Sequence, residues 1–285
     1  MRISSILAAE KPCLSFEVFP PKQAEHIDKV TAAAMEIASL RPGFVSVTYG
    51  AGGATDSHTL SIAREIQRGG VPALAHLTCV GARREGVYAQ LDAFRQAGIE
   101  NILALRGDIP AGLDFPDGDY AYAAGLIRDI AAYGGFCVGA ACYPEGHVEC
   151  DSPALDRLRL KQKVDAGVDF LVTQMCFDND LLYKFAYQIR ELGVSVPLVE
   201  GIMPVTNGRQ IARICRLSGA YLPVRFRAIL DKYGDTPAAM RQAGIVYACE
   251  QIIDLLAGGW RAVHVYSMNK PDVARAIWES LKELL

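Results

Sequence analysis

Eight short runs of apolar and β-branched residues, separated by segments with helical periodicity, constrain the fold of this chain more than any other feature. The runs occupy residues 13–20, 44–50, 72–81, 101–108, 137–144, 170–178, 197–205 and 262–269. The segments between them, such as 26–40 and 87–99, repeat apolar residues at helical spacing. Strands that alternate with helices pair in parallel. Eight such units in 285 residues predict an α/β fold, a single (β/α)8 TIM barrel domain over residues 1–285, with two or three extra helices in 208–258 before the last strand.

A doubly wound nucleotide-binding sheet is the alternative fold for a chain with this alternation. Such a sheet usually carries G-x-G-x-x-G after its first strand. This chain reads FPPKQAEH there, at 19–26, and its GAGG at 50–53 lacks the required spacing. The sequence therefore favours the barrel.

The charge and the cysteines narrow the class of protein. The net charge is −3 and the sequence pI is about 6.0, without the basic stripe expected of a protein that binds nucleic acid or a membrane surface. The opening MRISSILAAEKP is too short and too charged for a signal peptide, so a cytoplasmic location is predicted. None of the eight cysteines forms a CxxC pair, which predicts reduced core thiols and no metal site.

Polar side chains follow most of the predicted strands at the point where each strand ends. In a barrel the carboxyl ends of the strands surround one mouth, where catalytic residues gather. This arrangement makes Arg106-Gly107-Asp108 part of a site rather than an adhesion loop. The residues expected at the mouth are Glu17, Thr48, Tyr49, His76, Thr78, Arg106, Asp108, Tyr143, Glu145, His147, Thr173, Gln174, Glu200, Pro204, Tyr266 and Asn269.

Glu17 has the most specific sequence context of these residues. It stands in SFEVFPP, between apolar neighbours. A carboxyl group in apolar surroundings has a raised pKa and can act as a general acid near neutral pH. The alternative is a glutamate that faces solvent or pairs with a basic side chain. A barrel strand is covered on both faces, which favours the general acid.

For the other candidate residues, the sequence is compatible with either a structural or a ligand-binding role. Arg106 and Asp108 are two residues apart, so in a strand they point the same way, either as an ion pair or beside a bound heterocycle and an anion. The segment 156–163 places basic side chains on one helical face, which suits either solvent or phosphate groups. Gln174 suits either a core hydrogen bond or the edge of a pterin ring. His76 and His147 are core or ligand-binding residues, without a third ligand at metal spacing.

Seven motifs in register resemble one family. They are SFEVFPPK, FVSVTYGAGG, AHLTCVG, NILALRGD, YPEGH, LKQKVDAGVDFLVTQMCFD and GIMPV, and they extend over about residues 13–270. The chain resembles methylenetetrahydrofolate reductase of the bacterial type, the catalytic barrel alone. The resemblance implies FAD as cofactor and hydride transfer from a donor to FAD and then to 5,10-methylenetetrahydrofolate, yielding 5-methyltetrahydrofolate in one-carbon metabolism, including the methyl branch of acetogenic carbon fixation. It also implies NADH, NADPH or a partner electron-transfer subunit as the donor, and a homo-oligomer or heteromer.

The resemblance also implies roles for individual residues. Glu17 matches the general acid that protonates N10 of the folate, and Asp108 matches the carboxylate between flavin and folate. The residues that match folate-binding positions are Gln174, Gln210 and Lys270. Those that match FAD-contacting positions are Thr48, Tyr49, Ala51, His76, Arg106, Gly107, Asp108, Ala123, Tyr143, His147, Asp156, Arg159 and Lys163.

Three departures from the family pattern bear on the cofactor and the donor. By the resemblance, Arg159 stands where well-known members have an asparagine at the FAD, and Ile214 stands where some members have a phenylalanine that stacks on folate or on the donor. Lys270 stands for an arginine and so loses a bidentate fork. Two other functions therefore stand beside the reductase. One is a pterin-binding barrel methyltransferase without flavin, and the other is a barrel subunit that receives electrons only from a partner protein.

Overall fold

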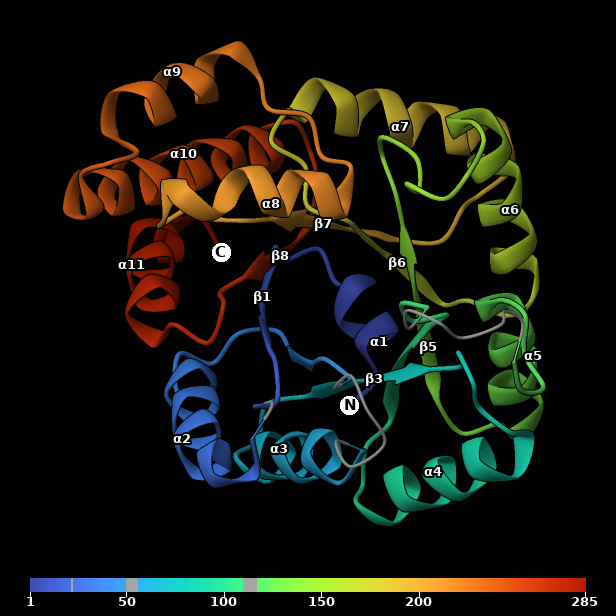
Figure 1. Cartoon of the computed structure of the whole chain (residues 1–285). Helices are drawn as coiled ribbons and strands as arrows, with labels where there is room; N and C mark the ends of the chain where they lie inside the picture. The colour runs from blue at the N-terminus through green and yellow to red at the C-terminus, as the bar shows by residue number, and fades with distance from the viewer. Residues whose placement is uncertain (22, 50–55, 110–116) are drawn as a thin grey trace.

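The computed structural model describes residues 1–21, 23–49, 56–109 and 117–285. Its eight strands form a closed barrel in which each strand pairs in parallel with the next and β8 pairs with β1 (Figure 1). The strands are β1 (Cys13–Val18), β2 (Val45–Val47), β3 (Ala73–Thr78), β4 (Asn101–Leu105), β5 (Cys137–Cys142), β6 (Phe170–Thr173), β7 (Leu198–Ile202) and β8 (Ala262–Tyr266). The predicted (β/α)8 barrel and all eight of its strands are confirmed.

Helices surround this barrel in a ring, and α1 lies across its centre in the view of Figure 1. Three of them, α8, α9 and α10, stand between β7 and β8, which confirms the extra helices predicted there. The α-helices are α1 (Ile3–Leu7), α2 (Ile27–Ala38), α3 (Asp56–Arg68), α4 (Arg84–Gln96), α5 (Ala123–Tyr133), α6 (Pro153–Asp165), α7 (Asn179–Glu191), α8 (Gly208–Ser218), α9 (Val224–Tyr233), α10 (Pro237–Ala257) and α11 (Pro271–Leu281). Short 3-10 turns cover Ala24–His26 and Lys282–Leu284.

Local signals set where the helices begin and end. α6 starts after Ser152, whose hydroxyl accepts the Leu155 N–H at 3.2 Å, and Pro153 occupies its first turn. α5 stops at Gly134, which has a φ of 75°, a conformation that costs glycine little. The start of α6 matters for function because this helix carries three of the predicted cofactor residues.

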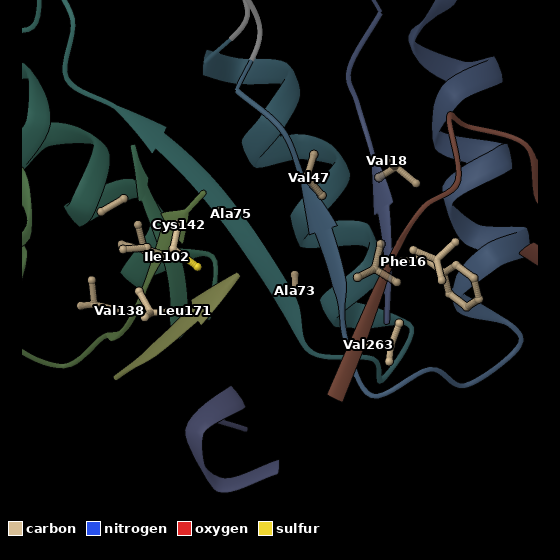
Figure 2. Packing of buried hydrophobic residues seen from close by; sticks show 14 of the residues in the cluster. Phe16, Val18, Val47, Ala73, Ala75, Ile102, Val138, Cys142, Leu171 and Val263 are labelled. Atoms are coloured by element: carbon tan, nitrogen blue, oxygen red, sulfur yellow. The ribbon is translucent and has the colours of Figure 1, made fainter. Parts of the chain in front are cut away.

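Alternate residues of each strand pack into two separate cores. Side chains on the outer face, such as Phe16, Val47 and Ile102, pack against the helices (Figure 2). Side chains on the inner face, such as Leu74 and Phe170, pack inside the barrel against Ile3 and Leu7 of α1, which closes the amino-terminal end of the barrel. The carboxyl-terminal end is thereby the end left for a site.

The end of β4 differs from the prediction, which extended this strand to residue 108. β4 stops at Leu105, and Gly107 has a φ of 89°. A side chain at Gly107 would come within 3.1 Å of the Thr78 Cβ atom, so the turn needs a glycine. The prediction that Arg106 and Asp108 share one face of a strand is therefore wrong, because the turn at Gly107 interrupts the alternation.

Most of the predicted core thiols are buried. All eight cysteines are free, and six of them are buried. Burial raises the pKa of Cys13 to about 12 and that of Cys79 to about 11, so both stay protonated and apolar. Within the described ranges, no three His, Cys, Asp or Glu side chains are grouped to hold a metal, and no helix is long and apolar enough to cross a membrane.

Candidate functional site

The carboxyl group of Glu17 lies inside the barrel, near the carboxyl end of β1. Ser46 on β2 donates a hydrogen bond from its hydroxyl to the Glu17 Oε2 atom at 3.3 Å. Two imidazole nitrogens lie just beyond hydrogen-bond distance of the same oxygen, His76 Nε2 at 3.7 Å and His264 Nε2 at 3.8 Å. Three neighbouring strands thus each contribute one polar group to the surroundings of this carboxylate.

Hydrogen bonds on both sides fix the ring of His264. The Ser15 hydroxyl donates to the Val263 carbonyl at 3.0 Å and lies 2.8 Å from His264 Nδ1. Ser15 thereby lies within hydrogen-bond distance of both the Val263 carbonyl and the ring of His264. The other nitrogen, Nε2, lies 3.0 Å from the Ser46 hydroxyl, and Phe44 stacks on the ring at 5.4 Å. Ser46 therefore stands between His264 and the carboxylate of Glu17.

The charge state of Glu17 differs from the prediction. Burial acts to raise its pKa, but His264, His76 and the Ser46 hydroxyl together bring the pKa below its usual value. The predicted rise in pKa is therefore wrong for the protein alone, because hydrogen bonds and electrostatic attraction from groups on β2, β3 and β8 together outweigh burial. About 20% of the side chain remains exposed, so its burial is incomplete.

His76 is held as a neutral ring beside Glu17. Burial lowers its pKa to about 4, and the attraction of Glu17 only partly opposes this. Its Nε2 atom has no hydrogen-bond partner among the described residues. A buried ring nitrogen without a partner is free to bond to a ligand that enters the mouth.

A cavity of about 370 Å³ opens beside this mouth, between the ends of β4 and β5 and the helices α5 and α6. Polar and apolar side chains line this cavity, and they come from these strands and helices and from the loops that follow the strands. The predicted cofactor residues that line it are Arg106, Ala123, Tyr143, His147, Asp156, Arg159 and Lys163.

Three basic side chains face this cavity from separate parts of the chain, Arg106 after β4 and Arg159 and Lys163 on α6. Lys163 donates from Nζ to the Ala141 carbonyl at 2.8 Å, and burial lowers its pKa, which Asp156 opposes. Asp156 in turn accepts the backbone N–H of His147 at 3.2 Å. The arrangement offers several cationic donors to an elongated ligand that carries phosphate groups.

The remaining predicted cofactor residues lie outside this cavity. Thr48 and Tyr49 follow β2 directly, and the Gln90 amide donates to the Tyr49 hydroxyl at 3.2 Å. Gly107 and the exposed Asp108 follow β4, and the charge of Asp108 acts on both Arg106 and Tyr143. Ala51 lies outside the described residues.

The three predicted folate residues come from separate elements. Gln174 follows β6, and its Oε1 atom accepts the N–H of Met175 at 2.9 Å. Gln210 is exposed on α8, and the exposed Lys270 donates from Nζ to the Thr206 hydroxyl at 2.7 Å. Ile214, one of the predicted departures, packs on a small apolar cluster around α8 and α9.

Glu200 and Thr173 do not belong to the mouth, contrary to the prediction from strand ends. They alternate with inward-facing Val199 and Val172 and share the outer, helix-covered face of the sheet. Glu200 is fully buried, and neither carboxylate oxygen has a hydrogen-bond partner among the described residues. Burial raises its pKa to about 8. The nearby Thr173 hydroxyl, whose oxygen accepts the Gly201 N–H at 2.8 Å, offsets this only in part because burial is the larger influence.

The site also contains residues that the sequence did not single out. Ser15, Ser46 and His264 surround Glu17, and Glu149 pairs with Arg106 in the cavity. The one signal in the sequence is a polar residue inside an otherwise apolar strand, as in AVHVY at 262–266. A polar residue of this kind can be assigned to a site only when the neighbouring strand is known, as β8 pairs with β1 here.

Comparison with known proteins identifies the family. The family model described as methylenetetrahydrofolate reductase matches residues 2–282. The chain belongs to the methylenetetrahydrofolate reductase family. The resemblance found in the seven motifs is thereby confirmed over nearly the whole chain.

The relatives fall into two lengths. Methylenetetrahydrofolate reductase (NADH) 1 of Arabidopsis thaliana is 35% identical over 295 residues, a match that covers 98% of this chain and 50% of that protein. The 5,10-methylenetetrahydrofolate reductases of Pectobacterium carotovorum and Escherichia coli are 33% and 32% identical over 269 residues, covering 94% of this chain and 89% and 90% of theirs. The chain spans about half the length of the plant reductases and about nine-tenths of the bacterial ones.

Solved structures share the fold. An uncharacterized Clostridium thermocellum protein that binds two copies of 5-methyl-5,6,7,8-tetrahydrofolic acid aligns over the full length of both chains, with a TM-score of 0.61 and 14% identity. Dihydropteroate synthase of Xanthomonas albilineans, in complex with 7,8-dihydropteroate, aligns over 97% of this chain and 94% of its own, with a TM-score of 0.53 and 16% identity. At these identities the likeness concerns the barrel.

Proposed function

We propose that this protein reduces 5,10-methylenetetrahydrofolate to 5-methyltetrahydrofolate and uses FAD as its cofactor. One observation carries the proposal. In a chain of this family, the carboxylate of Glu17 lies in the barrel mouth, and the cavity beside it is lined by Arg106, Arg159 and Lys163. Both lie at the carboxyl ends of the strands, where barrel enzymes place their reacting groups.

The residues of the cavity suit FAD. Its basic side chains suit the two phosphate groups, and its apolar walls, including Leu105 and Leu160, suit a ring system. A flavin ring at the mouth would meet the Nε2 atom of His76, which has no hydrogen-bond partner among the described residues, and the groups around Glu17. Arg159, where the family has asparagine, would add a cationic contact to the phosphate groups.

When bound, FAD supplies a carrier that takes a hydride from the donor and passes one to the folate. Glu17 would give a proton to N10 of the folate, which opens the five-membered ring and leaves a reactive iminium on the substrate. Gln174, with one amide donor group and one acceptor, would hold the edge of the pterin. Gln210, on α8 beyond β7, and Lys270, in the segment that follows β8, would contact the rest of the folate.

Glu17 must hold a proton to act as this acid. In the protein alone, donor groups keep its pKa low, and burial is the one influence that raises it. A folate that covers the mouth would remove the remaining exposed surface of the carboxyl group and so strengthen that influence. We therefore expect Glu17 to take up its proton when substrate binds.

The electron donor is a separate proposal. The names of the plant relatives include NADH, which makes NADH the first donor to test, with NADPH and a partner electron-transfer subunit as the other candidates. Ile214 cannot supply the aromatic stacking surface of the family, so the donor needs other contacts. A methyltransferase without flavin would leave the three basic side chains of the cavity without a role.

The decisive experiment is a visible spectrum of the protein purified without air, before and after addition of 5-methyltetrahydrofolate. The proposal predicts that the bands of a bound flavin bleach, because the folate half-reaction runs backwards and needs no donor. A flavin that stays oxidised would contradict the folate reaction for this chain alone. A colourless protein that does not bind added FAD would favour the methyltransferase.

Replacement of Asp108 by asparagine tests the electrostatic role of this residue. A negative charge beside the flavin disfavours the anionic reduced form, so its removal should raise the flavin reduction potential, on the order of tens of millivolts for one charge near the ring. The measurement is a redox titration of both proteins with an indicator dye. A potential that is unchanged or lower would contradict this account of Asp108.

A further inference from the structure

The guanidinium of Arg106 is already occupied within the cavity. Its Nη1 atom lies 2.5 Å from the Glu149 Oε2 atom, and its Nε atom donates to the Gly107 carbonyl at 3.0 Å. The hydrogen bond between the two side chains raises the pKa of Arg106 and lowers that of Glu149. Both groups are therefore fully charged at neutral pH, and the pair is an ion pair.

The two partners differ in exposure. The side chain of Arg106 is 17% exposed, whereas that of Glu149 is 48% exposed. Glu149 stands in the loop between β5 and α6, where its backbone N–H donates to His147 Nδ1 at 3.1 Å. Its carboxylate can return to water at little cost, whereas Arg106 needs an anion to replace it because its charge is mostly removed from solvent.

A phosphate group is such an anion. Carboxylate and phosphate oxygens accept the same hydrogen bonds from a guanidinium group. A carboxylate that stays in place would also repel a bound phosphate across the cavity, which both Glu149 and Arg106 line. The carboxylate of Glu149 and the phosphates of a cofactor therefore compete for Arg106.

We propose that Glu149 is a displaceable latch on the cofactor site, which holds Arg106 in the free protein and gives it up to a phosphate group of the cofactor. The inference rests on the proposed use of FAD. It assigns to Glu149 a control of cofactor affinity and of the rate at which the cofactor enters. The latch keeps the partly buried guanidinium paired with Glu149 while the cavity holds no phosphate.

The test measures FAD binding to protein stripped of flavin, by quenching of FAD fluorescence. Glu149→Gln and Glu149→Ala should each tighten binding by about threefold to tenfold, the range expected when one competing, partly exposed charge is removed, and should speed association. Glu250→Gln is the matched control, because Glu250 is 47% exposed and pairs with Arg225 on α9, away from the cavity. This control should bind FAD as the unaltered protein does.

The outcomes separate the latch from the proposed function. FAD binding by the unaltered protein, with equal or weaker binding by both Glu149 variants, would overturn the latch and leave the proposed function standing. An equal gain in the Glu250 control would also overturn it, since the effect would then be one of net charge. Failure of the unaltered protein to bind FAD at all would overturn both.

Discussion

Glu17→Gln should lower the rate of folate reduction by about 10² to 10⁴, the usual contribution of a general acid, and leave FAD binding and reduction by the donor unchanged. Glutamine has nearly the same shape as glutamate, and its amide oxygen can still accept the hydrogen bond that Ser46 now donates to Glu17. The variant loses only the proton that the folate nitrogen requires. The loss should therefore fall on one half-reaction.

Stopped-flow absorbance of the flavin separates the two half-reactions, with the donor and the folate added in separate experiments. Glu250→Gln is the control, because Glu250 is an exposed carboxylate on α10 that accepts a hydrogen bond from Arg225, away from the cavity. Its amide can keep that hydrogen bond, so both rates should stay near those of the unaltered protein. Normal folate turnover in Glu17→Gln would remove Glu17 as the acid.

The second large effect concerns stability and the buried Glu200. The pKa of this carboxyl is about 8 in the folded protein and 4.5 in an unfolded chain. Below pH 4.5 both states hold the proton, and the contribution to stability is fully present. As the pH rises from 4.5 to 8, only the folded state holds it, so the free energy of unfolding falls by about 1.4 kcal/mol per pH unit, on the order of 5 kcal/mol in total.

Glu200→Met replaces the carboxyl group with an unbranched apolar side chain of similar volume. Its free energy of unfolding should lie near that of the unaltered protein at pH 5 and exceed it by several kcal/mol at pH 8, because the titration is absent. Urea denaturation of both proteins at pH 5, 6.5 and 8 measures the difference. Glu191→Met is the control, because Glu191 is an exposed glutamate at the end of α7. This variant should show the same dependence of stability on pH as the unaltered protein. Parallel pH curves for Glu200→Met would mean that Glu200 is not held protonated.

The sequence predicted the barrel because each strand and helix leaves a local pattern. The ends of the strands were harder to predict, since apolar residues continue past the last ladder hydrogen bond. NILALRGD is the clearest case, because β4 ends at Leu105 and the turn at Gly107 changes the direction of the chain. A pattern of residue types does not record a positive φ.

The surroundings of the charged residues depend on contacts between distant parts of the chain. His264 lies 218 residues from the Ser46 hydroxyl that it contacts, and together these groups reverse the predicted shift of Glu17. Glu200 was assigned to the wrong face because both faces of a parallel strand are apolar, so PLVEGIMPV shows no alternation that marks the inner side. The residue types in the sequence were enough to select Glu17 and Glu200 as candidates. Their protonation depends on neighbours that meet only in the closed barrel.

The pairing of β1 with β8 has a consequence for the order in which the protein matures on the ribosome. The Ser267 hydroxyl donates to the Glu17 carbonyl at 2.7 Å across 250 residues, and Asn269 accepts the Phe19 N–H at 2.9 Å over the same separation. A nascent chain whose β8 is still in the exit tunnel has β1 to β7, but the barrel is still open beside Glu17. Contacts of such long range form slowly and late. The surroundings of Glu17 are therefore complete only after β8 and the residues that follow it have been synthesised and have met β1.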